Sequence, residues 1–165
     1  MEEQTQLIPL KDATKAVEDM TRRVALLYIA FARTLIDELG EEKGQEIIRK
    51  AVWEYGRRIG EATRKRVEAK GLEPLPENFN TGSDLSPIGF QTTNVRIGGE
   101  VRSRIFNCAL AQVWKEYGEE KLGNLYCQVD PAKMQSYHPN ATIVHTRNVL
   151  WGDDLCEMAT RNIDQ

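Results

Sequence analysis

The residues of this chain that are best suited to chemistry are its cysteines. All three, Cys108, Cys127 and Cys156, fall in one segment, each close to a carboxylate or to a predicted turn. A thiolate is the strongest nucleophile among side chains near neutral pH, and an adjacent carboxylate can move its proton. This clustering predicts a cysteine-dependent enzyme.

Cys127 and Asp130 form the leading pair. They are three residues apart, which in a helix places both side chains on one face. Pro131 opposes a continuous helix, because the residue before a proline is displaced from the helical region. Asp130 also has the pattern of an N-cap for a helix that starts at Pro131, and this role can coexist with a contact to the thiol. Cys127 itself is equally compatible with a small buried hydrophobe.

The other two thiols have different surroundings. Cys108 is expected in the first turn of a helix capped by Asn107, where the helix dipole and free N–H groups stabilise a thiolate. Cys156 follows two acidic residues, Asp153 and Asp154, whose charges raise the pKa of a nearby thiol. We therefore expect Cys156 to be a partner, a proton donor or a core residue rather than the nucleophile.

Three further residues are candidates for contacts with a substrate. His145 is the one credible imidazole base, although a hydrogen-bonded histidine within a strand is the commoner interpretation. Arg57 could hold a substrate carboxylate by bidentate hydrogen bonds, although most arginines of its helix are expected to be solvated. Trp151 stands beside a Gly-Asp-Asp turn and could line a pocket, although tryptophans are most often core residues.

Three thiols are also compatible with a soft metal such as zinc, with His145 or Asp154 as the fourth ligand. The sequence has no Cys-x-x-Cys knuckle, and the intervals between its cysteines are long and irregular. We therefore expect no metal and no cofactor, and keep soft-metal binding as an alternative.

Two long helices are expected in the N-terminal half, over residues 12–39 and 41–70, with Gly40 between them. In the second helix, close packing against a neighbour is the simplest explanation of Gly56 and Gly60, although a ligand could also approach there. The first helix has a wide apolar stripe that is expected to pack on the rest of the fold: Val17, Met20, Val24, Leu27, Phe31 and Leu35.

The remaining residues predict short strands and short helices. Strands are expected at 90–97 and 100–106, helices at 108–117, 119–128 and 131–138, and strands at 141–150 and 155–160. Gly98 and Gly99 suit a tight hairpin turn between the first two strands. This order indicates one α+β domain over 12–165, in which two N-terminal helices pack on a small antiparallel sheet with short inserted helices. Residues 1–11 are expected to form a flexible arm.

Composition limits the classes of partner. A chain of 165 residues has room for one full hydrophobic core, and a net charge of -3 gives no general attraction to nucleic acid or to anionic membranes. The longest apolar run, residues 24–32, is too short to span a bilayer. An odd number of cysteines without framework spacing, and the absence of a secretory signal, indicate a reducing cytoplasm. We expect a small-molecule substrate, and the apolar stripe makes a homo-oligomer conceivable.

From about residue 32 to 158 the sequence resembles the L-2-amino-thiazoline-4-carboxylic acid hydrolase family of bacterial proteins. The segments that carry the likeness are residues 39–41, 55–57, 108–114, 123–130, 145–147 and 152–156. The chain departs from the family at Ala109, Leu155 and Met158, where members often carry a proline, a second cysteine and an aromatic residue. These departures concern the substrate more than the fold.

The resemblance implies a hydrolase that opens a C–N bond of a small cyclic amidine in a five-membered sulfur heterocycle. In such a reaction Cys127 would attack the C=N carbon and Asp130 would take or return the proton. Cys108 or Cys156 would assist, and Arg57 would hold the substrate carboxylate. In its residue types, Cys-x-x-Asp followed by a lone cysteine is also similar to the thiol–carboxylate–thiol constellation of organomercurial lyases, which gives an alternative chemistry.

Overall fold

The computed structural model describes residues 7–83, 85 and 87–163 of the chain. It opens with two long helices, α1 (Leu10–Leu39) and α2 (Glu41–Glu68), which meet at Gly40. Gly40 has a φ of +79°, a conformation that glycine adopts without the strain of a side chain. Helix α1 begins earlier than predicted, so Leu10 and Lys11 of the expected arm are helical. Residues 1–6 of that arm lie outside the described part of the chain.

Helix α1 buries a different face from the one predicted. Its buried residues, Ala25, Ile29, Ala32 and Ile36, recur at helical spacing and contact the rest of the fold. The expected stripe lies beside them and is largely exposed; Phe31, for example, is 66% exposed. The prediction was wrong because α1 has two adjacent apolar stripes. The buried one contains Ala25 and Ala32, whose small side chains let neighbouring elements approach the helix closely.

Helix α2 packs tightly on a short helix, α5 (Val129–Tyr137). A Cβ atom added to Gly60 would lie 2.1 Å from the carbonyl oxygen of Lys133, and one added to Gly56 would lie 2.7 Å from the Cβ of Ala132. Both glycines therefore serve close helix packing, as the sequence predicted.

Four strands form one antiparallel sheet in the order β1-β2-β4-β3. Their bounds are β1 Thr92–Ile97, β2 Glu100–Ile105, β3 Ala141–Arg147 and β4 Cys156–Asn162. The turn between β1 and β2 is Gly98-Gly99, both with positive φ, as expected for a tight hairpin. Strand β3 ends earlier than predicted, because residues 149–151 form a 3-10 turn in which Leu150 N–H donates to the Asn148 side chain.

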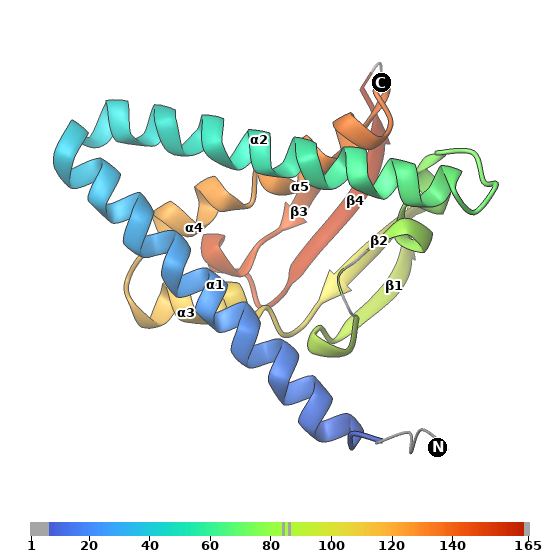
Figure 1. Cartoon of the computed structure of the whole chain (residues 1–165), viewed down its shortest axis with the longest axis horizontal. Helices are drawn as coiled ribbons and strands as arrows, with labels where there is room; N and C mark the ends of the chain where they lie inside the picture. Colours follow the sequence, from blue (N-terminus) through green and yellow to red (C-terminus); the bar gives the residue numbers. More distant parts are fainter. Residues whose placement is uncertain (1–6, 84, 86, 164–165) are drawn as a thin grey trace, which may run out of the picture.

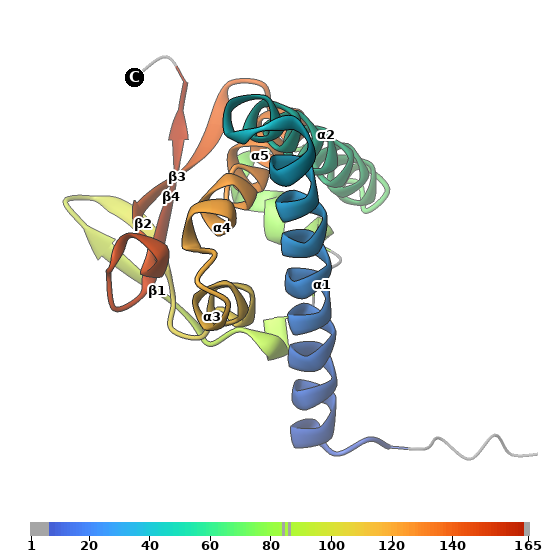
Figure 2. The same ribbon diagram turned by 90° about the vertical axis from the view of Figure 1, so that its left-hand side faces the viewer.

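The short helices α3 (Ala109–Glu116), α4 (Glu120–Tyr126) and α5 lie between the sheet and the two long helices (Figures 1 and 2). The prediction of an α+β fold, in which two N-terminal helices pack on a small antiparallel sheet with short inserted helices, is confirmed, and the inserted helices form the layer between them (Figure 2). Trp114 of α3 is 1% exposed and donates its indole N–H to the carbonyl oxygen of Ala25, which anchors α3 to α1. None of the described helices is long and apolar enough to cross a membrane.

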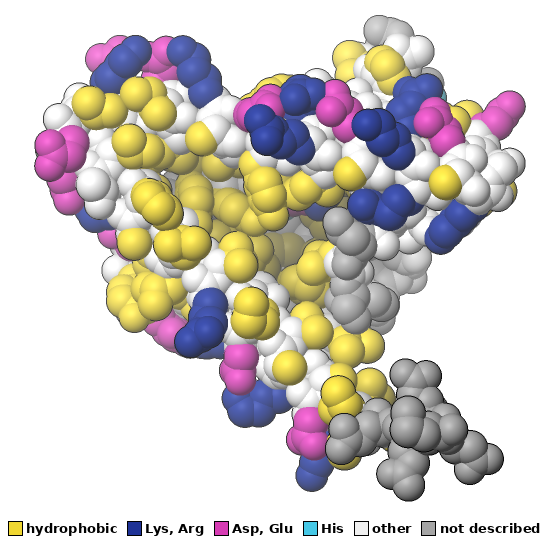
Figure 3. Space-filling view, in the orientation of Figure 1, with side chains coloured by type: hydrophobic (Ala, Val, Ile, Leu, Met, Phe, Trp, Pro, Cys, Tyr) yellow, Lys and Arg dark blue, Asp and Glu magenta, His cyan; other side chains and the backbone are white. Residues whose placement is uncertain are grey.

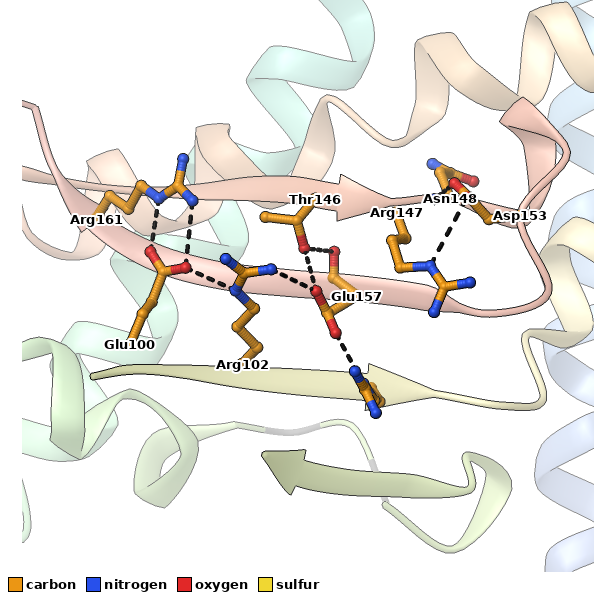
Figure 4. A network of polar contacts seen from close by, with 9 residues as sticks. Glu100, Arg102, Thr146, Arg147, Asn148, Asp153, Glu157 and Arg161 are labelled. Carbon is orange, nitrogen blue, oxygen red and sulfur yellow. Dashed lines mark hydrogen bonds and ion pairs between the residues drawn. The ribbon is translucent and has the colours of Figure 1, made fainter. Parts of the chain in front are cut away.

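The sheet face turned away from the helices carries a network of charged side chains (Figure 4). At its centre Glu157 is 1% exposed and accepts hydrogen bonds from Arg102 at 2.9 Å, Arg104 at 2.7 Å and Thr146 at 2.7 Å. A buried carboxylate is stable when it is paired and hydrogen-bonded in this way. The sheet therefore has an ionic outer face, and its inner face is the one that meets the helices.

Candidate active site

Asp130 lies inside helix α5 rather than at its N-cap. The helix begins at Val129, so Asp130 is in its first turn, and the predicted capping role is wrong. Pro131 is tolerated because the N–H groups of a first turn have no partner within the helix. The carboxylate of Asp130 is instead engaged by side chains: Lys133 Nζ lies 2.6 Å from Oδ1, and His145 Nε2 lies 2.9 Å from Oδ2.

These partners set the charge of Asp130. Burial by itself raises the pKa of this carboxyl group, but Lys133 and the hydrogen bond from His145 outweigh burial. The pKa of Asp130 therefore lies well below its usual value, and the group is an anion at neutral pH.

His145 lies on β3, with its side chain 11% exposed. Its second ring nitrogen, Nδ1, is 3.2 Å from Nδ2 of Asn148. The centroid of the Trp151 ring is 6.3 Å from that of the imidazole. The pairing of β3 with β4 shifts register between His145 and Arg147, and such irregularities are over-represented next to active sites.

Asn148 is 0% exposed and links His145 to two of the thiols. Its Oδ1 accepts the backbone N–H of Leu150 at 2.9 Å, which fixes the orientation of the amide. The amide nitrogen therefore faces His145 and, at 3.5 Å, the sulfur of Cys127. The sulfur of Cys156 lies 3.8 Å from Oδ1.

This orientation also fixes the tautomer of His145. An amide NH₂ group can only donate, so Nδ1 of the ring must accept. In the neutral ring the proton is then on Nε2, where it is donated to Asp130. The unprotonated Nδ1 and the sulfur of Cys127 thus both contact the amide nitrogen of Asn148.

All three thiols are neutral at rest. Burial raises the pKa of Cys127 to about 12, against the lowering effect of the hydrogen bond from Asn148. Burial likewise raises the pKa of Cys108 to about 11 and that of Cys156. For Cys156 an increase was predicted, but burial is its main cause and the charge of Asp153 contributes least.

Cys108 does not have the environment that was predicted for it. It is the N-cap residue of α3 rather than a residue of the first turn, and backbone N–H groups of α3 only partly offset its burial. Asn107 does not cap the helix, because its side chain instead bonds Glu18 and Gln112. The expected stabilisation of a thiolate at Cys108 is therefore outweighed.

Arg57 and Trp151 take different places. The guanidinium of Arg57 is paired with Glu54 and Glu61 along the surface of α2, so the structure does not bring it into the group around Asp130. Trp151 is brought to the site but is 58% exposed, and its indole N–H donates to Asn124 at 2.8 Å. It lies at the solvent side of His145, where it can contact a ligand.

The site lies within a recognised sequence family. The family described as L-2-amino-thiazoline-4-carboxylic acid hydrolase matches residues 20–159. The chain belongs to this family. Comparison with curated proteins and with solved structures gives no match. The resemblance found in the sequence is thus confirmed, over a longer stretch than residues 32–158.

Membership of this family supports hydrolase activity, and the matched region contains every residue of the Asp130–His145–Asn148–Cys127 chain of contacts. Two of the residues around it were missed in the sequence. Lys133 carried a usable signal, because it is three residues after Asp130 on one helix face. Asn148 carried none beyond its nearness to His145, since its role depends on the turn that follows β3.

Soft-metal binding finds no support in this geometry. In the part of the chain that the structure describes, no group of three His, Cys, Asp or Glu side chains could hold a metal ion. Of the two proposed fourth ligands, Asp154 is paired with Arg147 at the surface, and His145 is hydrogen-bonded to Asp130 and Asn148.

An apolar groove of about 180 Å³ runs between α1 and α2. Figure 3 shows hydrophobic side chains gathered in the hollow between these two helices. Tyr28 and Tyr126 line it together with Leu35, Val52 and Tyr55, and the rings of Tyr28 and Tyr126 are 5.0 Å apart. Tyr126 directly precedes Cys127, so this wall of the groove adjoins the thiol segment.

Proposed function

We propose that this protein is a cysteine-dependent hydrolase that opens a C–N bond of a thiazoline carboxylate or a related small cyclic amidine, with Cys127 as the nucleophile. The observation that carries the proposal is the continuous chain of contacts from Asp130 through His145 and Asn148 to Cys127. A carboxylate that orients an imidazole near a nucleophile is the arrangement that activates a thiol, and here the Asn148 amide contacts both the imidazole and the thiol. Family membership supplies the class of substrate.

The high pKa of Cys127 means that its thiol needs a base at the moment of attack. In the proposed reaction the sulfur bonds to the amidine carbon while its proton passes to Nδ1 of His145, as the Asn148 N–H that Nδ1 accepts at rest moves off this nitrogen. The imidazolium then gives this proton to the ring nitrogen. As the C–N bond breaks, the amino group on the same carbon loses a proton and becomes a C=NH group, and this second proton lets the ring nitrogen leave as an amine. Water next attacks the carbon held on sulfur and gives a proton to His145, which returns it to the leaving sulfur and restores the thiol.

Asp130 acts through His145 in this scheme. Its carboxylate accepts the proton on Nε2 and stabilises the imidazolium that forms. The sequence had suggested that Asp130 itself takes the thiol proton, but His145 lies between the carboxylate and the Asn148 amide that contacts the sulfur. Lys133 rather than Arg57 is the cation of this group, so we expect a substrate carboxylate to lie nearer to Lys133.

The alternatives from the sequence are a soft-metal or thiophilic-ligand binding protein and an organomercurial-lyase-like site. No contact among the described residues specifically favours either of them. The sulfurs of Cys127 and Cys156 approach different atoms of Asn148, and each makes its hydrogen bond to this amide. The hydrolase is therefore the function that the geometry supports best.

The test is turnover of 2-aminothiazoline-4-carboxylate by the Cys127→Ser variant. We expect kcat to fall at least about 10³-fold, as when the nucleophile of a comparable group is removed. Thr34→Ser, at an exposed position of α1, is the control and should keep the activity. Undiminished turnover by Cys127→Ser would remove this residue from the mechanism.

A further inference from the structure

We propose that Asn148 is the positioning residue that gives the thiols their separate roles. Its amide nitrogen holds Cys127 as the sulfur that becomes a thiolate, and its amide oxygen holds Cys156 as a sulfur that stays protonated. The catalytic meaning of this inference rests on the proposed hydrolase, but the division between the thiols can be tested without turnover.

Both ends of the Asn148 amide have all their hydrogen-bonding positions occupied. A carboxamide offers two N–H donors and two lone pairs on oxygen. The donors face Cys127 Sγ and His145 Nδ1, and the oxygen faces Leu150 N and Cys156 Sγ. A fully buried amide with all its hydrogen bonds made is rigid, because any rotation leaves buried groups without partners.

The two ends of the amide favour opposite charge states of the sulfur atoms that they contact. An N–H that points at Cys127 stabilises a negative sulfur, and this contact lowers the pKa of Cys127 against the effect of burial. The carbonyl oxygen can only accept, so Cys156 donates its S–H to it, while burial outweighs the backbone N–H of Val149 that lowers the pKa of this thiol. Ionising Cys156 would place a thiolate against the carbonyl oxygen at 3.8 Å.

The Asn148 amide also contacts both the nucleophile and the base. Sulfur of Cys127 and Nδ1 of His145 both lie against the one NH₂ group of Asn148, at 3.5 and 3.2 Å. One NH₂ group therefore holds both the nucleophile and the base. Because Nδ1 accepts an N–H of the amide, the proton of the neutral ring stays on Nε2, where Asp130 accepts it.

Asn148→Asp is the sharpest variant, because aspartate has nearly the same shape and keeps an oxygen that accepts Leu150 N–H. An ionised carboxylate cannot donate to Cys127 and adds a negative charge beside it, so the thiolate is disfavoured. The measurement is the rate of alkylation by iodoacetamide at each cysteine from pH 7 to 10, resolved by peptide mass spectrometry. We expect the rate at Cys127 to fall about tenfold or more at each pH, which corresponds to about one pKa unit.

Cys108 is the internal control, because its thiol has no contact with Asn148. The added charge also reaches Cys108, but its alkylation rate should fall much less than that of Cys127, because Cys108 loses no N–H donor. An unchanged Cys127 profile in the folded variant, or an equal change at Cys108, would overturn the proposal. Loss of turnover in Cys127→Ser is a separate result, so an inactive hydrolase and a wrong assignment of Asn148 can be told apart.

A second measurement needs no variant and decides the matter if Asn148→Asp does not fold. Nitrogen-15 chemical shifts of His145 in the unaltered protein report which ring nitrogen carries the proton. We expect a protonated Nε2 and an unprotonated Nδ1 in the neutral ring. The reverse tautomer would mean that Asn148 does not donate to the ring, and it would overturn the proposal.

Discussion

The charge and the contacts of Asp130 depend on residues that its position in the sequence does not reveal. The sequence placed it three residues after Cys127, but its carboxylate is shared between Lys133 and His145. It stays ionised despite burial because both partners favour the charged form. A buried anion of this kind fixes a neighbouring imidazole in one orientation and one tautomer.

Replacing Asp130 with asparagine tests this role. The amide keeps the shape but removes the negative charge, so His145 loses the group that stabilises its protonated form. We expect kcat for the thiazoline carboxylate to fall about 10² to 10⁴-fold, while KM changes little. Steady-state kinetics measures both constants, and Asp19→Asn, at an exposed pair with Lys15, is the control. A rise in KM with kcat unchanged would contradict the orienting role.

At the scale of elements, the site depends on how closely helix α5 approaches α2. Gly56 and Gly60 remove side chains from the contact surface, and the backbone of α5 occupies that space. The approach places the first turn of α5, with Asp130, opposite His145 on β3. A change in this helix pair should therefore affect both stability and the site.

We expect Gly60→Ala to lower the free energy of unfolding by about 1–3 kcal/mol, since the added methyl would meet the carbonyl of Lys133. Overpacking against backbone cannot be relieved by a rotamer change. Urea unfolding followed by circular dichroism measures the effect. Glu61→Ala, the next residue on the exposed face of α2, is the control and should change stability by less than about 0.5 kcal/mol. Equal stability of Gly60→Ala and the unaltered protein would show that α5 can move away.

At the scale of the whole molecule, the sheet separates an ionic outer face from the face that carries the site. Hydrogen bonds from Arg102, Arg104 and Thr146 lower the pKa of Glu157 to about 2. An unfolded glutamate has a pKa of about 4.3. The stabilisation that comes from the ionised Glu157 is thus present above pH 4.3 and is lost as the pH falls toward 2.

Glu157→Gln should therefore be less stable than the unaltered protein at pH 7, and the difference between them should shrink as the pH falls from about 4.5 to about 2. Urea midpoints measured across this range give the comparison. Glu38→Gln, which removes one charge from the end of α1, controls for net charge. A difference that stays constant with pH would mean that Glu157 does not titrate with folding.

Helix α1 also carries an exposed apolar stripe beside its buried face. Met20, Val24, Leu27 and Phe31 follow one another at helical spacing, and all are exposed. Pairing of two chains, which the sequence made conceivable, stays a prediction, and sedimentation equilibrium tests it.

Much of this protein follows from local sequence. Helical periodicity, Gly40, the Gly98-Gly99 turn and the order of strands fixed the α+β class, because these signals act within a few residues. The sequence also identified Cys127, Asp130 and His145 as candidates, since their side chains are the ones capable of the chemistry. Only the tertiary structure decided their partners. It joined Asp130 to His145 and placed Asn148 between His145 and Cys127. It also left Arg57 on the surface and chose which of two apolar stripes α1 buries. These choices depend on contacts between residues far apart in the chain, where the shape of the packed elements rather than local preference decides which groups meet.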